Sequence, residues 1–443
     1  MKRNQGFHIV LCVVLTVLLF LPLVQQEFHP FPVKKLNGAA VEAEKPKLDL
    51  NTYRDMSYQT QLEDYVADHF GFRENVIRLY NQYLWMFRKT YAADVVVGKD
   101  RWLYSKTSVL DHYRQRPYEF ETSNEALKLK FEKDLKRLKT VQELLARRGT
   151  QLFVLICPAK DMVYPEHLPE GDKFVMGDGL RAIDYYPQAF AENGIHYLDV
   201  CTWFQQIKDT VGYPLFPQRG MHWSNIACVH ASDLIFKYME HLTGKNMPDL
   251  KIGPLYHDAT RNPDDDLEQN LNLAWGILPA EHNCYANVEV VRDSAAQQLN
   301  LITIGDSFFW NMCYALPMDS IFNRYVYWYY FNTIYFDPEH TNVSQVDLME
   351  ELDRADVVMI SLSATQLYEI NHGFLSQALL QLTLDDADRM SSILEGVEER
   401  MRSDSLWYES LKEKAAKRGV TLDEAMRADA LYIISQNPEQ YLE

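Results

Sequence analysis

The strongest constraint on the fold is a helix-then-strand pattern in the middle of the chain. An amphipathic segment ends at Arg147-Arg148-Gly149, where positive charge and glycine are typical of a helix C-terminus. It is followed by Gln151 to Cys157, an almost wholly apolar stretch that stops at Pro158. A strand that is apolar on both faces must be covered on both faces, which favours a parallel sheet between layers of helices.

The same alternation continues toward the C-terminus. The capping-box spacing of Thr122 and Glu125 predicts where the first long helix begins. The further predicted helices are 180–193, 226–242 and 346–354, and the further predicted strands are 196–200, 299–304 and 357–360. This pattern predicts a three-layer α/β sandwich with a mostly parallel sheet. Sites of such folds lie beyond the C-terminal ends of the strands, so we expect three segments to meet on one rim. They are Pro158-Ala159-Lys160, Gly305-Asp306-Ser307 and Ser361-Leu362-Ser363.

Two residues carry candidate chemistry. Ser307 follows the strand predicted at 299–304, and a serine at a strand-to-helix turn is held out of the sheet near backbone N–H groups. His222 stands just before the helix predicted at 226–242 and could accept the serine proton and return it to a leaving group. Each alone is a weak signal, because Gly-Asp-Ser is a common turn and a His-Trp pair is often structural.

The N-terminus predicts export. Phe7 to Val24 is an apolar run of 18 residues preceded by Lys2 and Arg3. That length just spans a bilayer, and the basic flank predicts a cytoplasmic N-terminus with the main domain periplasmic or extracellular. A cleaved signal peptide is the alternative. The nearest small-residue pair, Ala39-Ala40, lies too far from the run, which favours an uncleaved single-pass anchor.

The net charge and the cysteine spacing argue against a nucleic-acid-binding protein and against a cysteine metal site. The formal net charge of −18 argues against nucleic acid as a partner, because phosphate binding relies on clustered Lys and Arg. The six cysteines have no Cys-x-x-Cys pair and no metal-type spacing. Cys157, Cys228 and Cys313 sit in apolar contexts, which predicts buried free thiols, with one disulfide left open.

Five further stretches occur in a characteristic order. They are Tyr65 to Arg73, Val96 to Tyr104, Pro158 to Pro165, the His222-Trp223 pair and Gly305 to Phe308. In this order the chain resembles the AlgX/AlgJ-related (DHHW-like) proteins, SGNH-hydrolase relatives that O-acetylate extracellular polysaccharides. The matching stretches cover roughly residues 20 to 380.

The resemblance implies roles for particular residues. Ser307 would be the nucleophile and His222 the general base, with the Ser307 amide as one oxyanion donor. The candidate oxyanion or substrate-binding residues are Asp306, Asn311, Lys160 and Trp223. Lys160 would hold a sugar or orient its loop, and an exposed structural lysine is the alternative. The chemistry needs no metal or organic cofactor. A multi-spanning membrane acyltransferase would supply the acetyl group.

One departure from the family pattern stands out. The family has Asp-x-His-Trp, whose aspartate orients the histidine, whereas this chain has Gly220 at the matching position. Loss of that carboxylate in serine hydrolases costs about 10⁴-fold in turnover but leaves measurable catalysis. Asp199, Asp306 or a backbone carbonyl are the candidates to replace it.

The predicted domain organisation follows from these observations. It consists of an anchor at 1–25, a stalk at 26–57, an SGNH-like α/β domain at 58–383 and a helical C-terminal appendage at 384–443. Within the domain, about 244–298 is predicted to be a loop-rich insertion, with Asp264-Asp265-Asp266 as a solvated acidic loop rather than a cation site. The aromatic stretch 324–336 has two interpretations, core packing or contact with sugar.

Two functions remain open. The first is an exported, membrane-anchored O-acetyltransferase or acetylesterase that acts on a cell-surface or extracellular polysaccharide through Ser307 and His222. The second is a non-catalytic glycan-binding or polysaccharide-assembly protein on the same fold, which the glycine at position 220 favours. We favour the first because the serine and the histidine are both retained.

Overall fold

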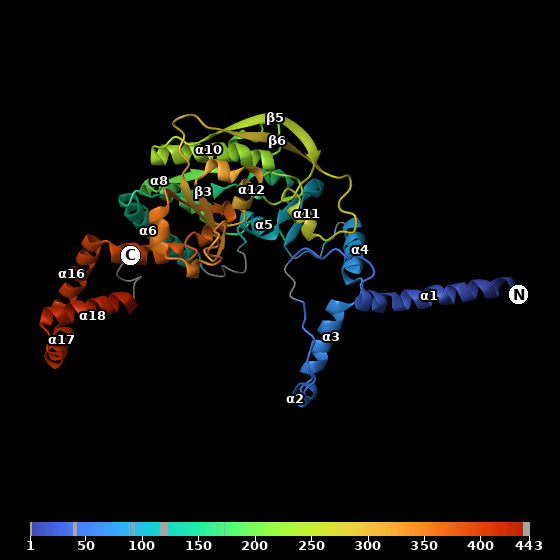
Figure 1. The fold of residues 1–443 in the computed structure, drawn as a ribbon, viewed down its shortest axis with the longest axis horizontal. Coiled ribbons are helices and arrows are strands. Elements are labelled where there is room, and N and C mark those ends of the chain that lie inside the picture. Colours follow the sequence, from blue (N-terminus) through green and yellow to red (C-terminus); the bar gives the residue numbers. More distant parts are fainter. Residues whose placement is uncertain are drawn as a thin grey trace. The chain divides into compact units, whose positions relative to one another are not determined.

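The chain forms two compact units (Figure 1). The computed structural model describes residues 2–38, 42–87, 89, 90, 92, 94–115, 123–171 and 173–436. The N-terminal unit comprises Met1–Lys106, Gln218–Met221 and Ala259–His282. The α/β unit comprises Thr107–Pro217, His222–Asp258 and Asn283–Glu443. The domain boundaries expected from the sequence stay predictions.

A mostly parallel sheet forms the centre of the α/β unit. Its strand order is β4-β3-β10-β7-β8-β9. The bounds are β3 (Gln151–Cys157), β4 (Tyr197–Asp199), β7 (Asn300–Gly305), β8 (Arg324–Tyr329), β9 (Thr333–Tyr335) and β10 (Val357–Ser363). All neighbours pair in parallel except β8 and β9, which are antiparallel. β10 ends three residues beyond the predicted end at 360, so Ser361 to Ser363 form the C-terminal end of this strand.

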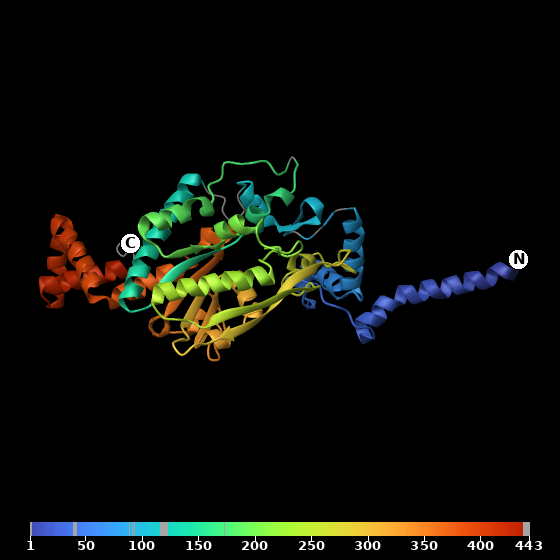
Figure 2. The same ribbon diagram turned by 90° about the horizontal axis from the view of Figure 1, so that it is seen from above.

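Helices cover both faces of this sheet (Figures 1 and 2). Alternate side chains of β3 enter two separate cores: Leu152, Val154 and Ile156 enter the first, and Phe153, Leu155 and Cys157 enter the second. The first core is closed mainly by α6 (Asn124–Arg147), α8 (Ala182–Asn193), α14 (Leu348–Arg354) and α15 (Phe374–Asp385). The second is closed mainly by α9 (Val200–Ile207), α10 (Asn225–Thr243), α12 (Phe308–Ala315) and α13 (Met318–Ile321). The predicted three-layer α/β sandwich is therefore confirmed.

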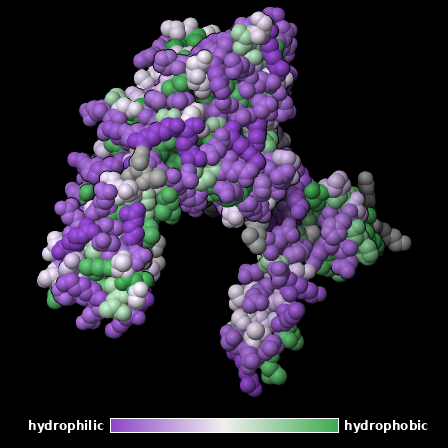
Figure 3. All heavy atoms as spheres, turned by 60° about the vertical axis from the view of Figure 1, so that its left-hand side comes forward, coloured by the Kyte–Doolittle hydropathy of each residue, from purple (hydrophilic) through white to green (hydrophobic). Residues whose placement is uncertain are grey.

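The helix caps follow local rules. Ser123 caps α6 by accepting a hydrogen bond from the Ala126 amide at 3.1 Å, whereas Thr122 lies outside the described residues. Thr421 and Glu424 form a capping box ahead of the last helix. The C-terminal helices are α16 (Ala387–Ser403), α17 (Ser405–Arg418) and α18 (Leu422–Gln436). The molecular surface seen in Figure 3 is mostly hydrophilic, as the large negative charge requires.

Shorter elements complete the α/β unit. They are α5 (Lys106–His112), α7 (Lys160–Val163), η3 (Pro165–His167), η4 (Val343–Gln345) and η5 (Ala364–Glu369). The aromatic stretch 324–336 belongs to the core in part, and its contact with sugar stays a prediction. Tyr327 and Trp328 are fully buried between the helical layers, while Tyr335 and Phe336 are exposed.

The predicted loop-rich insertion is wrong. This region contains two long strands, β5 (Asp249–Ala259) and β6 (His282–Val291), which pair in a two-stranded sheet. Most residues of β5 are exposed or half-buried on both faces, so the strand has no apolar alternation that would have revealed it.

The N-terminal unit contains a helix of membrane-spanning length. The elements are α1 (Lys2–Phe28), α2 (Leu50–Arg54), α3 (Ser57–His69), α4 (Arg73–Met86), β1 (Val95–Val97), η1 (Lys99–Arg101), β2 (Leu103–Ser105) and α11 (Asp266–Asn270). Residues Gly6–Phe28 are long and apolar enough to cross a bilayer, and their most apolar 18-residue window is not buried. β1 and β2 pair antiparallel on either side of the turn that contains Gly98.

The acidic triplet and the cysteines test two further predictions from the sequence. Asp264 is buried, so the acidic triplet is not a solvated loop. Asp266 is half-buried, and its Oδ1 accepts hydrogen bonds from the amides of Met221 and Leu267, both at 2.7 Å. All six cysteines are free thiols. Cys157 and Cys228 are buried, as predicted, whereas Cys313 is only half-buried.

Substitution of Gly305 tests how β7 and β10 are held together. A Cβ at Gly305 would lie 1.8 Å from the Ser361 carbonyl oxygen, so we expect Gly305→Ala to destabilise the protein by about 3 kcal/mol or more. Gly212→Ala is the control, because a Cβ there meets nothing within 4 Å. Chemical denaturation compares the two variants. Equal midpoints would show that the strands separate without cost.

Candidate functional site

The strand-to-helix junction after β7 places Ser307. β7 ends at Gly305 and α12 begins at Phe308, so Ser307 is the N-cap residue of α12. Its hydroxyl makes no capping hydrogen bond, which leaves it available to another partner. That partner is His222, whose Nε2 lies 2.7 Å from the Ser307 Oγ. The two residues singled out from the sequence are thus brought together from positions 85 apart in the chain.

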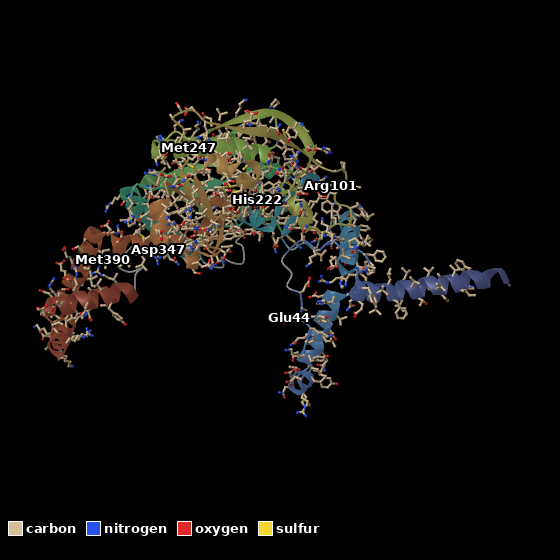
Figure 4. All side chains as sticks on the ribbon, in the orientation of Figure 1. Glu44, Arg101, His222, Met247, Asp347 and Met390 are labelled. Atoms are coloured by element: carbon tan, nitrogen blue, oxygen red, sulfur yellow. The ribbon has the colours of Figure 1, made fainter. Side chains whose placement is uncertain are left out.

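The loop that carries His222 is fixed by hydrogen bonds to its neighbours. Ser224 caps α10, and its hydroxyl donates to the Pro214 carbonyl at 2.7 Å. The Ser224 amide donates to the Leu215 carbonyl at 2.9 Å. The His222 ring packs against Phe308 with ring centroids 4.8 Å apart. His222 is buried and Ser307 is half-buried, and Figure 4 shows His222 among the elements of the α/β unit.

Asn311 links this loop to α12. Its Nδ2 donates to the Trp223 carbonyl at 3.3 Å. Both side chains are buried, and Trp223 has no accessible surface, because its ring packs against Phe308 and Phe204 in the second core. Trp223 is therefore a core residue, and its expected contact with substrate is corrected. A role for Asn311 as an oxyanion donor stays a prediction, while its contact supports a positioning role.

Asp306 joins the ends of β7 and β10. Its carboxylate accepts hydrogen bonds from the Ser363 amide at 2.7 Å and the Phe308 amide at 3.1 Å. The Tyr327 hydroxyl donates to the Asp306 carbonyl oxygen. Burial raises the pKa of Asp306, and the two amide donors act in the opposite direction. The carboxylate is engaged with the backbone, which supports a structural role, and a role of Asp306 in the oxyanion site or in substrate binding stays a prediction.

Lys160 lies at the C-terminal end of β3, as expected, but it is buried. It is the first residue of α7 and only 3% exposed. The alternative of an exposed structural lysine is therefore wrong. A role in holding a sugar or orienting the loop stays a prediction.

The two carboxylates considered as replacements for the missing aspartate have other partners. Asp199 caps α9, and its oxygens accept from the Thr202 amide at 2.8 Å and the Thr202 hydroxyl at 2.6 Å. Asp306 accepts from backbone amides, as described above. The segment beside Gly220 has a different carboxylate partner, since the Met221 amide donates to Asp266. No local pattern indicates this contact, because 45 residues separate Met221 from Asp266.

Sequence reasoning also missed a buried acidic pair at the same end of β3. Asp111 and Asp161 are both buried, and neither Asp161 oxygen has a hydrogen-bond partner. His112 Nδ1 lies 3.4 Å from Asp161 Oδ2, and the Tyr368 hydroxyl donates to Asp111 at 2.8 Å. Burial and the nearby Asp161 raise the pKa of Asp111 to about 7. Within the described ranges, no three His, Cys, Asp or Glu side chains are grouped as a metal site.

Comparison with known proteins identifies the central part of the chain. Residues 95–301 match the family model described as the SGNH hydrolase-like domain of the acetyltransferase AlgX. This match is a similarity over less than half of the chain. The matched part includes His222 and ends shortly before Ser307.

One curated relative is similar over part of the chain. The chain is 27% identical over 234 residues to a probable alginate O-acetylase AlgJ of Pseudomonas aeruginosa. The alignment covers 48% of this chain and 55% of the relative, so the chain spans about half the length of that protein.

Two solved structures are also similar. The O-acetyltransferase domain of Pseudomonas putida AlgJ is 16% identical, with a TM-score of 0.41, over 64% of this chain and 98% of that one. Pseudomonas aeruginosa AlgX is 14% identical, with a TM-score of 0.38, over 62% of this chain and 66% of that one.

The acidic pair makes a prediction for stability. Because the pKa of Asp111 is raised from 3.8 to about 7, folding favours its protonated form. This contribution is full at low pH and is lost as pH rises through 7, on the order of 3 kcal/mol between pH 5 and pH 8. Asp111→Asn should therefore melt at a higher temperature than the unsubstituted protein at pH 8. Thermal melts at pH 5, 6, 7 and 8 measure this, and an unchanged pH dependence in the variant would contradict it.

Proposed function

We propose that the protein is an exported O-acetyltransferase or acetylesterase-like enzyme that acts on a polysaccharide through Ser307 and His222. The observation that carries this proposal is the 2.7 Å contact between the Ser307 Oγ and the His222 Nε2. This is within the distance over which a general base takes a proton from a nucleophile. The position of Ser307 at the start of α12 adds a second argument, because N–H groups at a helix N-terminus stabilise negative charge.

The proposed reaction proceeds in two steps through a covalent intermediate. The Ser307 Oγ attacks the acetyl carbonyl while His222 Nε2 takes its proton, and His222 then gives that proton to the departing donor oxygen. A sugar hydroxyl next attacks the acetyl-serine and loses its proton to His222. This releases the O-acetyl sugar and regenerates the Ser307 hydroxyl. Attack by water in the second step gives the esterase reaction instead.

The partners of this reaction are part of the proposal. α1 would anchor the chain in a membrane with the α/β unit outside the cytoplasm, which its apolar length and basic flank support. A polysaccharide would be the acceptor, because a relative bears the name alginate O-acetylase. A multi-spanning membrane acyltransferase would deliver the acetyl group to the outer side.

Gly220 favours a second candidate function. Without the family's aspartate, the chain could bind glycan or assist polysaccharide assembly while the serine and histidine remain unused. The contact between the serine and the histidine favours the enzyme, because a side chain freed from catalysis has no need to keep that distance.

Removal of either reacting side chain separates these functions. With 4-nitrophenyl acetate as the acetyl donor, we expect Ser307→Ala and His222→Ala to lower kcat/KM of the full-length protein by about 10³-fold or more. Release of 4-nitrophenol measures hydrolysis. The matched controls are Ser294→Ala and His257→Ala, which alter exposed residues and should keep full activity. If hydrolysis is absent from the unsubstituted protein, or equal in all variants, the enzyme proposal fails.

A second prediction concerns the residue next to His222. Asp266 accepts the Met221 amide, so Asp266→Ala should loosen the backbone beside the base and lower kcat by about tenfold with KM little changed. Asp266→Asn keeps an acceptor oxygen and should retain most of the activity. The same ester assay, with a thermal melt of each variant, measures both effects. Equal loss in both variants would show that the negative charge matters rather than the hydrogen bond.

A further inference from the structure

The N-terminal unit contains a pocket that has no part in the chemistry of Ser307. Its volume is about 740 Å³, within the range of small-molecule sites. The lining residues include Gln82, Trp85, Met86, Trp275, Leu278 and the turn 97–101. We call it the tryptophan pocket. The turn belongs to the stretch Val96 to Tyr104, which the sequence singled out and which the proposed function does not use.

The loop that forms one wall of the tryptophan pocket is firmly held. The buried Gln82 accepts a hydrogen bond from the Trp275 amide at 3.2 Å and donates to the Gly276 carbonyl at 3.4 Å. Glu268 accepts from the Ile277 amide at 2.6 Å and pairs with the buried Arg219 at 3.0 Å. These contacts fix the backbone of the loop, so its side chains are presented in a defined place.

The side chains that this loop presents are apolar and exposed. Trp275 is 58% exposed and Leu278 is 61% exposed, although the backbone around them is fixed. Large apolar side chains exposed at the wall of a pocket are a favourable contact surface for a ligand, because covering them removes apolar area from water. Trp85 from α4 supplies a second indole to the same pocket. Two indoles give flat apolar faces, which suit the C–H faces of a pyranose ring.

The rim of the tryptophan pocket is basic. Lys99 and Arg101 lie beside Asp100 on the turn, and all three are exposed, in a chain whose net charge is −18. Arg101 donates from Nη1 to the Leu278 carbonyl at 3.0 Å, which connects the turn to the loop. A guanidinium has five N–H donors, so further donors remain for a ligand. Figure 4 labels Arg101 in this part of the chain. Arginine forms paired hydrogen bonds with carboxylates.

We propose that the tryptophan pocket binds an acidic pyranose unit of a polysaccharide. The indole rings of Trp85 and Trp275 would contact the sugar ring, and Arg101 would bind its carboxylate, with Lys99 adding positive charge. This inference rests on the proposed function in taking a polysaccharide as the substrate. It assigns to the N-terminal unit a glycan-binding site that does not require Ser307.

Calorimetric titration of an oligosaccharide tests this proposal. The full-length protein with Ser307→Ala is titrated with a hexamer of α-1,4-linked galacturonate and with the same hexamer after reduction of its carboxyl groups. We expect binding of the acidic hexamer and weaker binding of the reduced one. Trp275→Ala should weaken both by about tenfold, which corresponds to about 1.4 kcal/mol. Arg101→Gln should weaken only the acidic hexamer, and Arg101→Lys should restore part of the loss.

Matched controls separate the pocket from general surface effects. Tyr432→Ala removes an aromatic ring that is 64% exposed in α18, and Lys251→Gln removes an exposed positive charge in β5. Both should bind the hexamers as well as the unsubstituted chain does. Absence of hexamer binding, equal affinity for the two hexamers, or affinities unchanged by Trp275→Ala and Arg101→Gln would each overturn the proposal.

The experiment also keeps this proposal distinct from the proposed enzyme. If the Ser307→Ala protein binds the hexamer and the unsubstituted protein hydrolyses no ester, the pocket proposal stands and the enzyme proposal fails. If hydrolysis depends on Ser307 but no hexamer binds, the enzyme proposal stands and the pocket proposal fails. Binding of vesicles containing phosphatidylglycerol, lost with Trp275→Ala and without binding of the hexamer, would assign the pocket to lipid and overturn the glycan proposal.

Discussion

The close approach of β7 and β10 at Gly305 determines where the candidate nucleophile stands. The Ser361 carbonyl occupies the space that a Cβ at position 305 would need. The Asp306 amide donates to that same carbonyl at 3.1 Å, and the Asp306 carboxylate reaches the Ser363 amide. These contacts fix the turn after β7, so Ser307 leaves the sheet as the N-cap residue of α12. A looser pairing would let the serine move relative to its partner.

The histidine is positioned by backbone contacts and packing. In a complete triad, a carboxylate orients the imidazole and stabilises its charged form. Here, the orientation is supplied by the hydrogen bonds of Ser224, by the link from Asn311 to the Trp223 carbonyl and by the face of Phe308. The hydrogen bond from the Met221 amide to Asp266 fixes the backbone on the other side of His222. The proposed enzyme would thus keep the geometry of the pair while it lacks the aspartate of the family motif.

The α/β unit buries charged groups, whereas the N-terminal unit exposes apolar ones. In the α/β unit, carboxylates such as Asp111 and Asp161 are buried at the end of the sheet, where desolvation favours the protonated acid at Asp111. In the N-terminal unit, Trp275 and Leu278 are held in water by a loop whose backbone is fixed. Both arrangements lower the stability of the folded protein, and such destabilising groups are typical of sites that bind a ligand or carry out a reaction.

The sequence alone determined the layered fold and made Ser307 and His222 candidates through the order of its motifs. Apolar strands such as Gln151–Cys157 must be covered on both faces, so local periodicity was sufficient for the layers. Local periodicity failed for β5, because both faces of this strand are open to water. It also failed for the acidic triplet, because Asp266 accepts a hydrogen bond from Met221, which is distant in the chain. Only the tertiary structure decided that Trp223 is core, that Asp306 binds backbone amides and that the pair at 222 and 307 is in contact. The physical reason is that burial and hydrogen bonding between residues 50 to 90 positions apart depend on chain packing, which no local pattern encodes.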